Sequence, residues 1–526
     1  MGDILYRILQ TLLSVFCFVQ SSILILIYGG KGKVVPPIKN PLLLKSASKL
    51  AEEIREGKIR SEDVVLAYIH RISEVQPYLN ATVDCFFDDA IQQAREVDIL
   101  VASRRCTVEE LANKKPLLGV PFTAKVLLHL KGMPCTGASK IFEDQVATED
   151  SPSVALMKDA GAILIATTNS AELALNIETV NKIYGRTCNP YDTNRTPGGS
   201  SGGESALIAA GGSLIGLGND LAGSVRIPAH FTGIFGHKPT AGLVTSRGSF
   251  PPEFPNKLLE PVHMNIFKYL CTGPLCRYAE DLTLVMKILS TEDELKVDFN
   301  QKVDFKKLKI CYLTNIRSPL VSTTDKRIIA ALKNAVTFFE KKCNTVAKEI
   351  KIPSWVRVNR CICSVFMRLL NNYEKEICIM KGLNENFEFL KSFFGVAKIV
   401  FVSAFMIWLS PLLYSEDKFE FYAEMIRGLR EEFNNNLDKN TILLMPTYPC
   451  IVPYHNGTFP YLLSLSFTTL FNLLGLPATH CPMDFTEQKL PYGIQIVGCK
   501  GNDALTIACA AELEKEFGGW KPPGEV

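Results

Sequence analysis

Residues 196–240 read TPGGSSGGESALIAAGGSLIGLGNDLAGSVRIPAHFTGIFGHKPT. Linkers rich in glycine and serine are polar throughout, whereas the middle of this stretch, Ala206 to Leu217, is apolar enough to be buried. Glycines this dense let the backbone approach a ligand closely, and they leave N–H groups free to face an anion. We therefore interpret the stretch as the floor of an active site that carries two serines, Ser200 and Ser224.

Short apolar runs alternate with helical patterns on both sides of this stretch. Continuous apolar runs of this length are typical of strands that are buried on both faces. The alternation predicts an α/β fold with helices on both faces of a central sheet. No boundary divides residues 41–526, which we expect to form one domain. The predicted strands include Leu117–Val120, Phe122–Lys125, Ala162–Ala166, Leu214–Leu217, Ile442–Thr447 and Tyr492–Gly498.

The N-terminal segment from Ile8 to Tyr28 is 21 residues long and carries no charge. A helix needs about 20 apolar residues to cross a bilayer. A signal peptide has a shorter apolar region and a small-residue cleavage site, which the following GGKGK does not supply. We expect a retained single-pass helix in an endomembrane, with residues 1–40 as anchor and linker. A cleaved signal and a buried helix are the alternatives.

The overall composition excludes several classes of protein. Hydrophobic residues make up 47% of the 526 residues and charged residues 21%, which indicates a folded core. The net charge is +3 without a long basic run, so nothing indicates nucleic-acid binding. The 16 cysteines are scattered without zinc-ligand spacing, so we expect free thiols, no metal and no cofactor.

A serine nucleophile requires a base. His230 and His237 follow Ser224, but neither has an evident aspartate to orient it. The chain has no G-x-S-x-G elbow and no G-K-[ST] loop, which leaves the α/β-hydrolase and nucleotide-binding interpretations weak. Lys125 remains. Apolar residues surround it in sequence, and desolvation lowers the pKa of a lysine enough to make it a proton acceptor. A surface lysine with an apolar stem is the alternative.

The segments GVPFTAK (119–125), PGGSSGG (197–203) and GNDLAGSVRIPA (218–229) resemble the amidase signature family. The spacings, 75 residues from Lys125 to Ser200 and 24 from Ser200 to Ser224, are those of the family. The resemblance covers nearly everything from Pro41 onward. With its N-terminal segment, the chain is most similar to the N-terminally anchored fatty acid amide hydrolases. The resemblance implies a large mixed central sheet of the amidase signature fold.

The family uses a Ser-cisSer-Lys triad, and the resemblance implies roles for the matching residues. Ser224 matches the nucleophile, Ser200 the bridging serine that follows a cis peptide bond, and Lys125 the base. The implied activity is cleavage of fatty acid amides to free fatty acid and amine through an acyl-enzyme. The implied partners are a lipid amide and a membrane, and a homodimer stays open. The backbone N–H groups implied for the oxyanion are those of Leu221, Ala222, Gly223 and Ser224, and the supporting residues are Ser201, Asp220 and Arg226, of which the last two are expected to pair.

Three residues depart from the family pattern. Val126 replaces an acidic residue, Asn219 a small hydroxyl residue, and Ala222 a glycine. If position 222 requires a positive φ, alanine costs about 1 kcal/mol there. An amidase-fold protein with weakened or no activity, which binds lipid amides at a membrane, is therefore the alternative. The glutamyl-tRNA amidotransferases share the motifs, but they work with partner chains and lack an anchor.

A second apolar run, Ile399 to Ser410, precedes Pro411. It is too short to span a bilayer, and we expect it to break at the proline. We interpret it as an interfacial segment or as an apolar wall for an acyl chain, with a plain core helix as the alternative.

Overall fold

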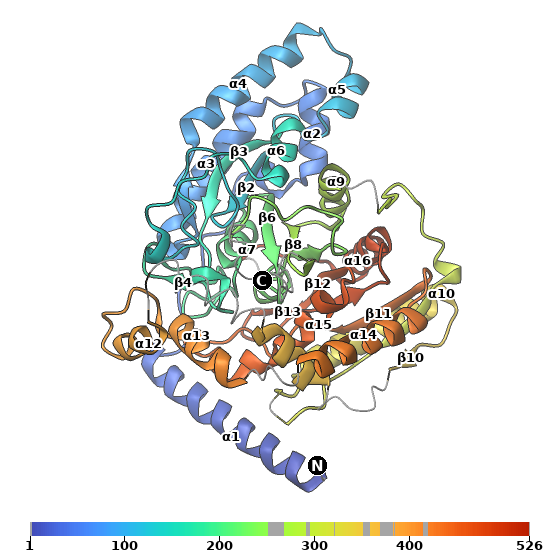
Figure 1. The fold of residues 1–526 in the computed structure, drawn as a ribbon. Coiled ribbons are helices and arrows are strands. Elements are labelled where there is room, and N and C mark those ends of the chain that lie inside the picture. Colours follow the sequence, from blue (N-terminus) through green and yellow to red (C-terminus); the bar gives the residue numbers. More distant parts are fainter. Residues whose placement is uncertain are drawn as a thin grey trace.

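The computed structural model describes residues 3–250, 268–290, 295–319, 321–350, 358–368, 382, 384–413 and 419–524. Within these residues a mixed sheet of 11 strands crosses the molecule, and helices pack on both of its faces (Figure 1), which confirms the predicted fold class. In spatial order the strands are β1 (Thr82–Cys85), β3 (Ile163–Thr168), β2 (Pro121–Lys125), β6 (Ile215–Asp220), β8 (Cys271–Cys276), β7 (Phe235–Lys238), β12 (Ala478–Phe485), β13 (Pro491–Val497), β11 (Thr441–Pro446), β9 (Lys309–Tyr312) and β10 (Lys348–Glu349). A separate hairpin joins β4 (Val180–Asn181) to β5 (Gly185–Arg186).

The strand directions decide where loops meet. β2 runs parallel to both of its neighbours, and its register with β6 pairs Thr123 with Gly216 and Ala124 with Leu217. Parallel neighbours end at the same edge of a sheet, which is where open α/β sheets bind ligands. Lys125, the last residue of β2, therefore lies beside the last residues of β6.

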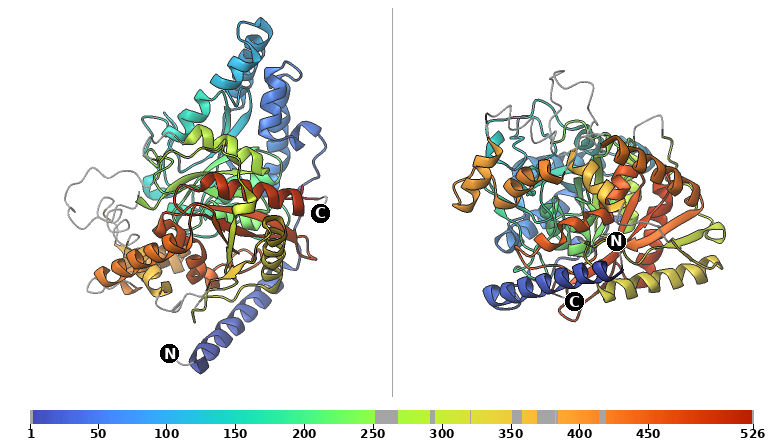
Figure 2. Two further views of the ribbon diagram at one scale, coloured as in Figure 1. Left: turned by 90° about the vertical axis from the view of Figure 1, so that its right-hand side faces the viewer. Right: turned by 60° about the horizontal axis from the view of Figure 1, so that its bottom comes forward.

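The helices gather at the two ends of the sheet and over its faces. α2 to α6 surround the β1–β3–β2 end, and α10 and α14 lie beside the β11–β9 end (Figures 1 and 2). The bounds are α1 (Asp3–Tyr28), α2 (Ala47–Arg55), α3 (Ser61–Leu79), α4 (Phe87–Ser103), α5 (Val108–Lys114), α6 (Pro152–Asp159), α7 (Gly202–Ala209), α8 (Arg226–Thr232), α9 (Ala279–Leu289), α10 (Lys326–Cys343), a helix over 358–368, α12 (Glu385–Phe393), α13 (Phe401–Leu413), α14 (Phe419–Asn436), the 3₁₀ helix η8 (Phe459–Leu465), α15 (Ser466–Leu474) and α16 (Asp503–Phe517).

Strand β11 shows that both faces of the sheet are covered. Successive side chains of a strand point to opposite faces. Ile442 and Leu444 belong to one cluster of buried apolar residues, and Leu443 and Met445 belong to another on the opposite face. Each cluster packs against helices, so the continuous apolar run of the sequence reflects burial on both sides.

Two local predictions are wrong. Residues 117–120 form a turn instead of a strand, because Gly119 has a φ of 74° and the Val120 N–H bonds back to the Leu117 carbonyl. The expected break at Pro411 does not occur, since α13 runs on to Leu413. A proline in the last turn removes only one backbone hydrogen bond. The described cysteines are free thiols, as predicted, and Cys378 lies outside the described residues.

The apolar N-terminal segment forms α1, which lies along the side of the body below α12 and α13 (Figure 1). Residues Arg7–Tyr28 have a mean hydropathy of 2.1 and are long enough to cross a membrane. A core helix or a signal sequence passes the same test of length and composition.

The antiparallel pairing of β8 with β7 leaves no room for a side chain at Gly273. A Cβ there would lie 2.1 Å from the His237 carbonyl oxygen, which belongs to the backbone and has little freedom to move. We expect Gly273→Ala to destabilise the fold by about 1–3 kcal/mol, because overpacking forces backbone shifts. The change is measured as a lowered melting temperature.

Gly428→Ala in α14 is the matched control, because a Cβ at position 428 meets nothing within 4 Å. Replacing a helical glycine there should raise stability by about 0.5–1 kcal/mol. Equal melting temperatures for the two variants would contradict this packing argument.

Candidate active site

Four chain segments meet at the carboxyl ends of β2 and β6. Lys125 ends β2, Ser200 precedes α7, Asn219 lies near the end of β6, and Ser224 precedes α8. The Lys125 side chain is fully buried, and its Nζ lies 2.7 Å from Ser200 Oγ and 2.7 Å from Asn219 Oδ1. The peptide bond between Gly199 and Ser200 is cis. The structure thus brings Lys125 and Ser200 into direct hydrogen-bond contact.

The surroundings of Lys125 favour the neutral amine. Burial lowers the pKa of Lys125 to about 7, against the opposing effect of the Asp220 and Glu204 carboxylates. Glu204 accepts hydrogen bonds from the Thr123 and Thr168 hydroxyls, and burial raises its pKa to about 8. A charged group loses its hydration when it is buried, so the pKa values of both groups shift towards their uncharged forms.

The two serine loops are tied together through their backbones. The Ser201 N–H donates to the Ser224 carbonyl oxygen at 3.2 Å, and the Ala171 N–H donates to the Ser200 carbonyl oxygen at 3.0 Å. The Ser201 hydroxyl is buried and has no partner within the described part of the chain. The contact of Ser201 with the Ser224 loop is therefore made by its backbone.

Ser224 lines a pocket of about 60 Å³. Gly199, Asn219, Leu221 and Ala222 line the same space, and most of the remaining wall is apolar. The apolar side chains are Leu173, Ala174, Leu175, Ile177, Ile227, Phe250, Leu270, Phe366, Met406, Leu462 and Leu465. Such a wall suits an apolar group held beside the serine.

The four backbone N–H groups predicted for an oxyanion are not equivalent. The Gly223 N–H donates to Asp220 Oδ1 at 2.8 Å, so it is already occupied. Those of Leu221, Ala222 and Ser224 have no protein acceptor among the described residues, and all three residues line the pocket. Three donors, instead of the expected four, are therefore free to face a ligand.

Asp220 and Arg226 hold the loop that carries Ser224, and the expected ion pair between them is present. Arg226 donates from Nη2 to Asp220 Oδ1 at 2.9 Å and from Nε to Oδ2 at 3.1 Å, with both side chains fully buried. Burial alone would raise the pKa of Asp220, but the charge and hydrogen bonds of Arg226 outweigh it and hold the pKa below its usual range. The carboxylate therefore stays ionised and accepts the loop N–H groups of Gly223 and Val225.

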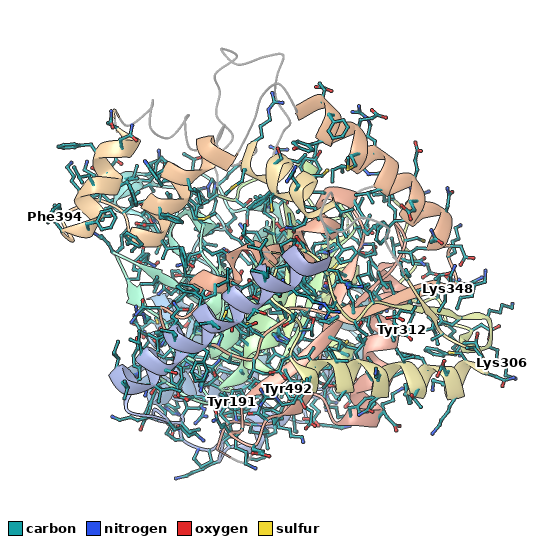
Figure 3. The ribbon with its side chains drawn as sticks, turned by 90° about the horizontal axis from the view of Figure 1, so that it is seen from below. Tyr191, Lys306, Tyr312, Lys348, Phe394 and Tyr492 are labelled. Atoms are coloured by element: carbon teal, nitrogen blue, oxygen red, sulfur yellow. The ribbon has the colours of Figure 1, made fainter. Side chains whose placement is uncertain are left out.

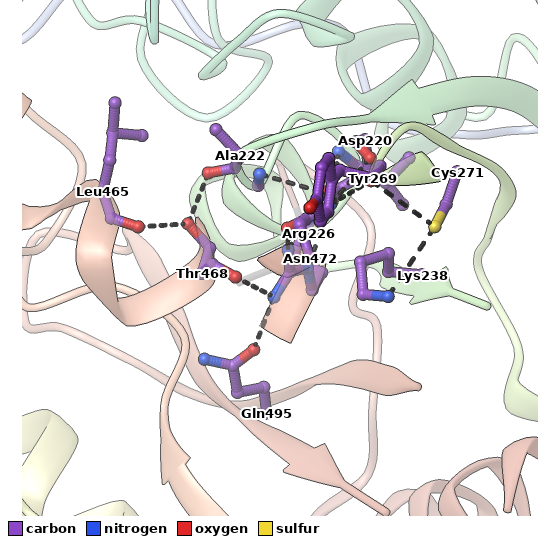
Figure 4. Close-up of polar contacts among 12 residues, drawn as sticks. Asp220, Ala222, Arg226, Lys238, Tyr269, Cys271, Leu465, Thr468, Asn472 and Gln495 are labelled. Carbon is purple, nitrogen blue, oxygen red and sulfur yellow. Dashed lines mark hydrogen bonds and ion pairs between the residues drawn. The ribbon is translucent and has the colours of Figure 1, made fainter. Parts of the chain in front are cut away.

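The same network reaches α15, as Figure 4 shows. Arg226 donates to Asn472 Oδ1 at 2.7 Å and to Gln495 Oε1 at 3.1 Å. The Thr468 hydroxyl donates to the Ala222 carbonyl oxygen at 2.5 Å, and Asn472 Nδ2 donates to the Asp220 carbonyl oxygen at 2.8 Å. Sequence reasoning missed these supports, because they lie more than 240 residues away from the loop in the chain.

His237 has an aspartate partner that the sequence did not reveal. Its Nε2 lies 3.2 Å from Asp503 Oδ1, and its Nδ1 lies 2.9 Å from Thr479 Oγ1. Both ring nitrogens are occupied in a fully buried place, so His237 supports the sheet and is not a base for Ser224. Both ring nitrogens of His230 are occupied as well, by the Cys450 carbonyl oxygen and the Gly493 N–H, so His230 is not a base for Ser224 either.

Comparisons with known proteins show the family of the chain. Residues 63–507 match the family model for amidases. The chain is 38% identical over 501 residues to fatty-acid amide hydrolase 2-A of Danio rerio, covering 94% of this chain and 92% of the relative. It is 36% identical over 518 residues to fatty-acid amide hydrolase 2 of Homo sapiens, covering 95% and 94%. The chain belongs to the amidase family.

Solved amidase-family structures share its fold. A structure of fatty acid amide hydrolase matches with a TM-score of 0.72, covering 91% of this chain and 86% of that chain at 20% identity. A bacterial aryl acylamidase of the amidase signature enzymes matches with a TM-score of 0.72 at 23% identity, covering 90% of this chain and 97% of that chain.

In this amidase the three departures have specific surroundings. Ala222 is not among the residues with positive φ, whereas Gly223 has a φ of 118°, so alanine is accommodated without backbone strain. Asn219 supplies an amide oxygen to the Lys125 amine. Val126 is buried in the apolar cluster that contains Leu173 and Met406, so an apolar residue fits that place.

Removing the Arg226 guanidinium would leave the Asp220 carboxylate buried without its main partner. We expect Arg226→Met to cost about 3–5 kcal/mol of unfolding free energy, because breaking a buried pair strands a charge. The value is measured by urea unfolding.

Arg327→Met is the control, since the Arg327–Asp325 pair lies at the surface with Arg327 52% exposed. Exposed pairs contribute about 0–1 kcal/mol. A loss for Arg226→Met no larger than that of Arg327→Met would show that the buried pair does not hold the fold.

Proposed function

We propose that this protein is a membrane-anchored serine hydrolase that cleaves fatty acid amides to free fatty acid and amine. The observation that carries the proposal is the buried Lys125 amine, 2.7 Å from Ser200 Oγ, beside an apolar pocket lined by Ser224. The pocket suits an acyl group, and the most similar relatives carry the name fatty-acid amide hydrolase. In this proposal residues 41–526 form the catalytic domain, and residues 1–40 form the anchor and linker.

The chemistry is a proton relay coupled to acyl transfer. Neutral Lys125 accepts the Ser200 hydroxyl proton, and Ser200 accepts the Ser224 proton as Ser224 Oγ attacks the amide carbon. The resulting oxyanion faces the Leu221, Ala222 and Ser224 N–H groups, which are held in place before the reaction. Ser200 then protonates the amide nitrogen, the C–N bond breaks, and the amine leaves an acyl-enzyme. Water cleaves the ester by the same relay and releases the fatty acid.

Asn219 orients the base in this scheme. A neutral amine has two N–H donors and one lone pair. The amide oxygen of Asn219 can only accept, so it takes one N–H of Lys125 and leaves the lone pair available for the Ser200 proton. The amide nitrogen of Asn219 donates to the Phe250 carbonyl oxygen, which keeps the amide from turning over.

Membrane attachment is supported by α1 and the neighbouring helices. Apolar side chains of α1, among them Phe18, Leu26 and Ile27, are mostly exposed, and so are Phe393 and Phe394 at the end of α12. Exposed apolar residues that gather on one side of a protein are typical of lipid contact. The single-pass arrangement stays a prediction, since α1 must leave its contacts with the body in order to cross a bilayer.

Ser224→Ala should abolish both hydrolysis of a long-chain acyl amide and covalent labelling by a fluorophosphonate, because the reacting oxygen is gone. Activity is followed as released amine, and labelling by intact-protein mass. Ser153→Ala, a buried serine on α6, is the matched control and should label at the wild-type rate. A wild-type protein that binds the amide but neither labels nor hydrolyses it would be a lipid-amide binder instead.

The pH profile of kcat/KM should rise through pH about 7. The pKa of Lys125 is lowered, so the amine is protonated below about 7 and becomes an acceptor above it. Lys125→Ala should lose about 10²–10⁴ in kcat/KM together with this rising limb. A wild-type profile that is flat between pH about 6 and about 8 would rule out the lysine as the base.

A further inference from the structure

A second cavity lies next to the pocket above Ser224. It has a volume of about 290 Å³ and is lined by residues of α1, the helix over 358–368, α13 and the η8–α15 segment. Four side chains line both spaces: Phe366, Met406, Leu462 and Leu465. The two cavities are therefore neighbours that share part of their walls.

The volumes decide where a long acyl chain can go. The pocket at Ser224 has a volume of only about 60 Å³. Pockets that bury whole ligands of moderate size have about 300–1,000 Å³. A fatty acyl chain attached at Ser224 must therefore extend into the second cavity, whose lining is almost entirely apolar.

The wall of this cavity includes two residues of the N-terminal helix, Leu13 and Phe16. Phe16 makes an edge contact with Phe459 at 6.5 Å between ring centres, and Phe459 in turn packs against Phe405 of α13 at 5.5 Å. An unbroken set of aromatic contacts thus joins α1 to the helix that lines both cavities.

Polar contacts fix α1 in this place. The buried Gln10 amide donates to the carbonyl oxygens of Ser318, Pro319 and Val321 at 2.8, 3.0 and 2.9 Å. Further along the helix, Gln20 Nε2 donates to the Asn456 carbonyl oxygen at 3.1 Å.

The C-terminal end of α1 is fixed as well. Tyr28 stacks on Tyr454 with ring centres 5.8 Å apart and an interplanar angle of 4°. Figure 3 shows α1 lying across the body along its length. A helix that only attached the protein to a membrane would need none of these contacts with the body. A helix that forms the wall of a binding site needs them to stay in place.

We propose that α1 is part of the acyl-binding site, in which Leu13 and Phe16 contact the distal end of the acyl chain and set the chain length that is accepted. This inference rests on the proposed function and names the substrate-selecting residues of the same site. In this arrangement α1 stays docked on the body, and its exposed apolar side chains, among them Phe18, Leu26 and Ile27, remain available for contact with a membrane.

Photo-crosslinking tests the proposal without relying on catalysis. The probe is a palmitoyl amide with a diazirine at the terminal carbon, used on the full-length Ser224→Ala protein in detergent. We expect the crosslinked peptide to contain Leu13 and Phe16 of α1, in addition to peptides of α13 or η8. Crosslinks confined to α13, η8 and the helix over 358–368 would overturn the proposal.

Chain-length selectivity provides a second test. Leu13→Trp fills the distal space and should lower kcat/KM for palmitoyl amide by about tenfold relative to butyryl amide. Leu12→Trp is the matched control, because Leu12 is 59% exposed on the adjacent position of α1 and should leave the ratio unchanged. An equal change for both amides, or the same change in Leu12→Trp, would contradict the assignment.

The two proposals fail in different ways. A wild-type protein that hydrolyses neither amide would contradict the proposed function, while the crosslink to α1 would still test the binding site. A protein that hydrolyses both amides but shows no effect of Leu13→Trp would contradict only the role of α1.

Discussion

The site depends on one constraint, an amine that is fully buried in the protein. Lys125 ends a strand in the middle of the sheet, and the side-chain contacts of its Nζ that the structure gives are to Ser200 and Asn219. An unpaired ammonium in such a place carries a large desolvation penalty, so the neutral form is favoured. The parallel register of β2 and β6 and the tight loop at Ser200 are both required for this arrangement, because each supplies one of the two partners of the amine.

The η8–α15 segment connects the walls of the cavities to the loop that carries Ser224. Leu462 and Leu465 line both cavities, and Thr468, one turn further on, donates to the Ala222 carbonyl oxygen. Asn472 of the same helix contacts both Asp220 and Arg226. An acyl chain in the proposed site would therefore pack against the same segment that holds the Ser224 loop.

The site residues that belong to short sequence motifs were predictable. The residues that only the fold brings to the site were harder to predict. The positions of Lys125 and Ser200, and the pairing of Asp220 with Arg226, followed from short motifs. The occupied N–H of Gly223 did not, because it depends on the side-chain rotamer of Asp220. Thr468 and Asn472 come from a distant part of the chain and carry no motif, so only the tertiary structure shows that they hold the loop.

The fold was predictable from the same kind of signal. Apolar runs identified the central strands, because strands buried on both faces need apolar residues at every position. The run at residues 117–120 misled the prediction, since its leucines and valine are buried by a turn and not by a strand. The docking of α1 was also unpredictable, because a long apolar helix looks the same whether it meets lipid or protein.

The most direct test is the protonation state of Lys125 itself. Nitrogen-15 labelling of lysine side chains, with the Lys125 resonance assigned by its loss in Lys125→Met, allows the amine to be titrated by NMR. We expect a pKa of about 7, well below that of a lysine in water, because burial disfavours the ammonium form. A Lys125 resonance that remains that of an ammonium up to pH about 10, as for a lysine in water, would contradict it.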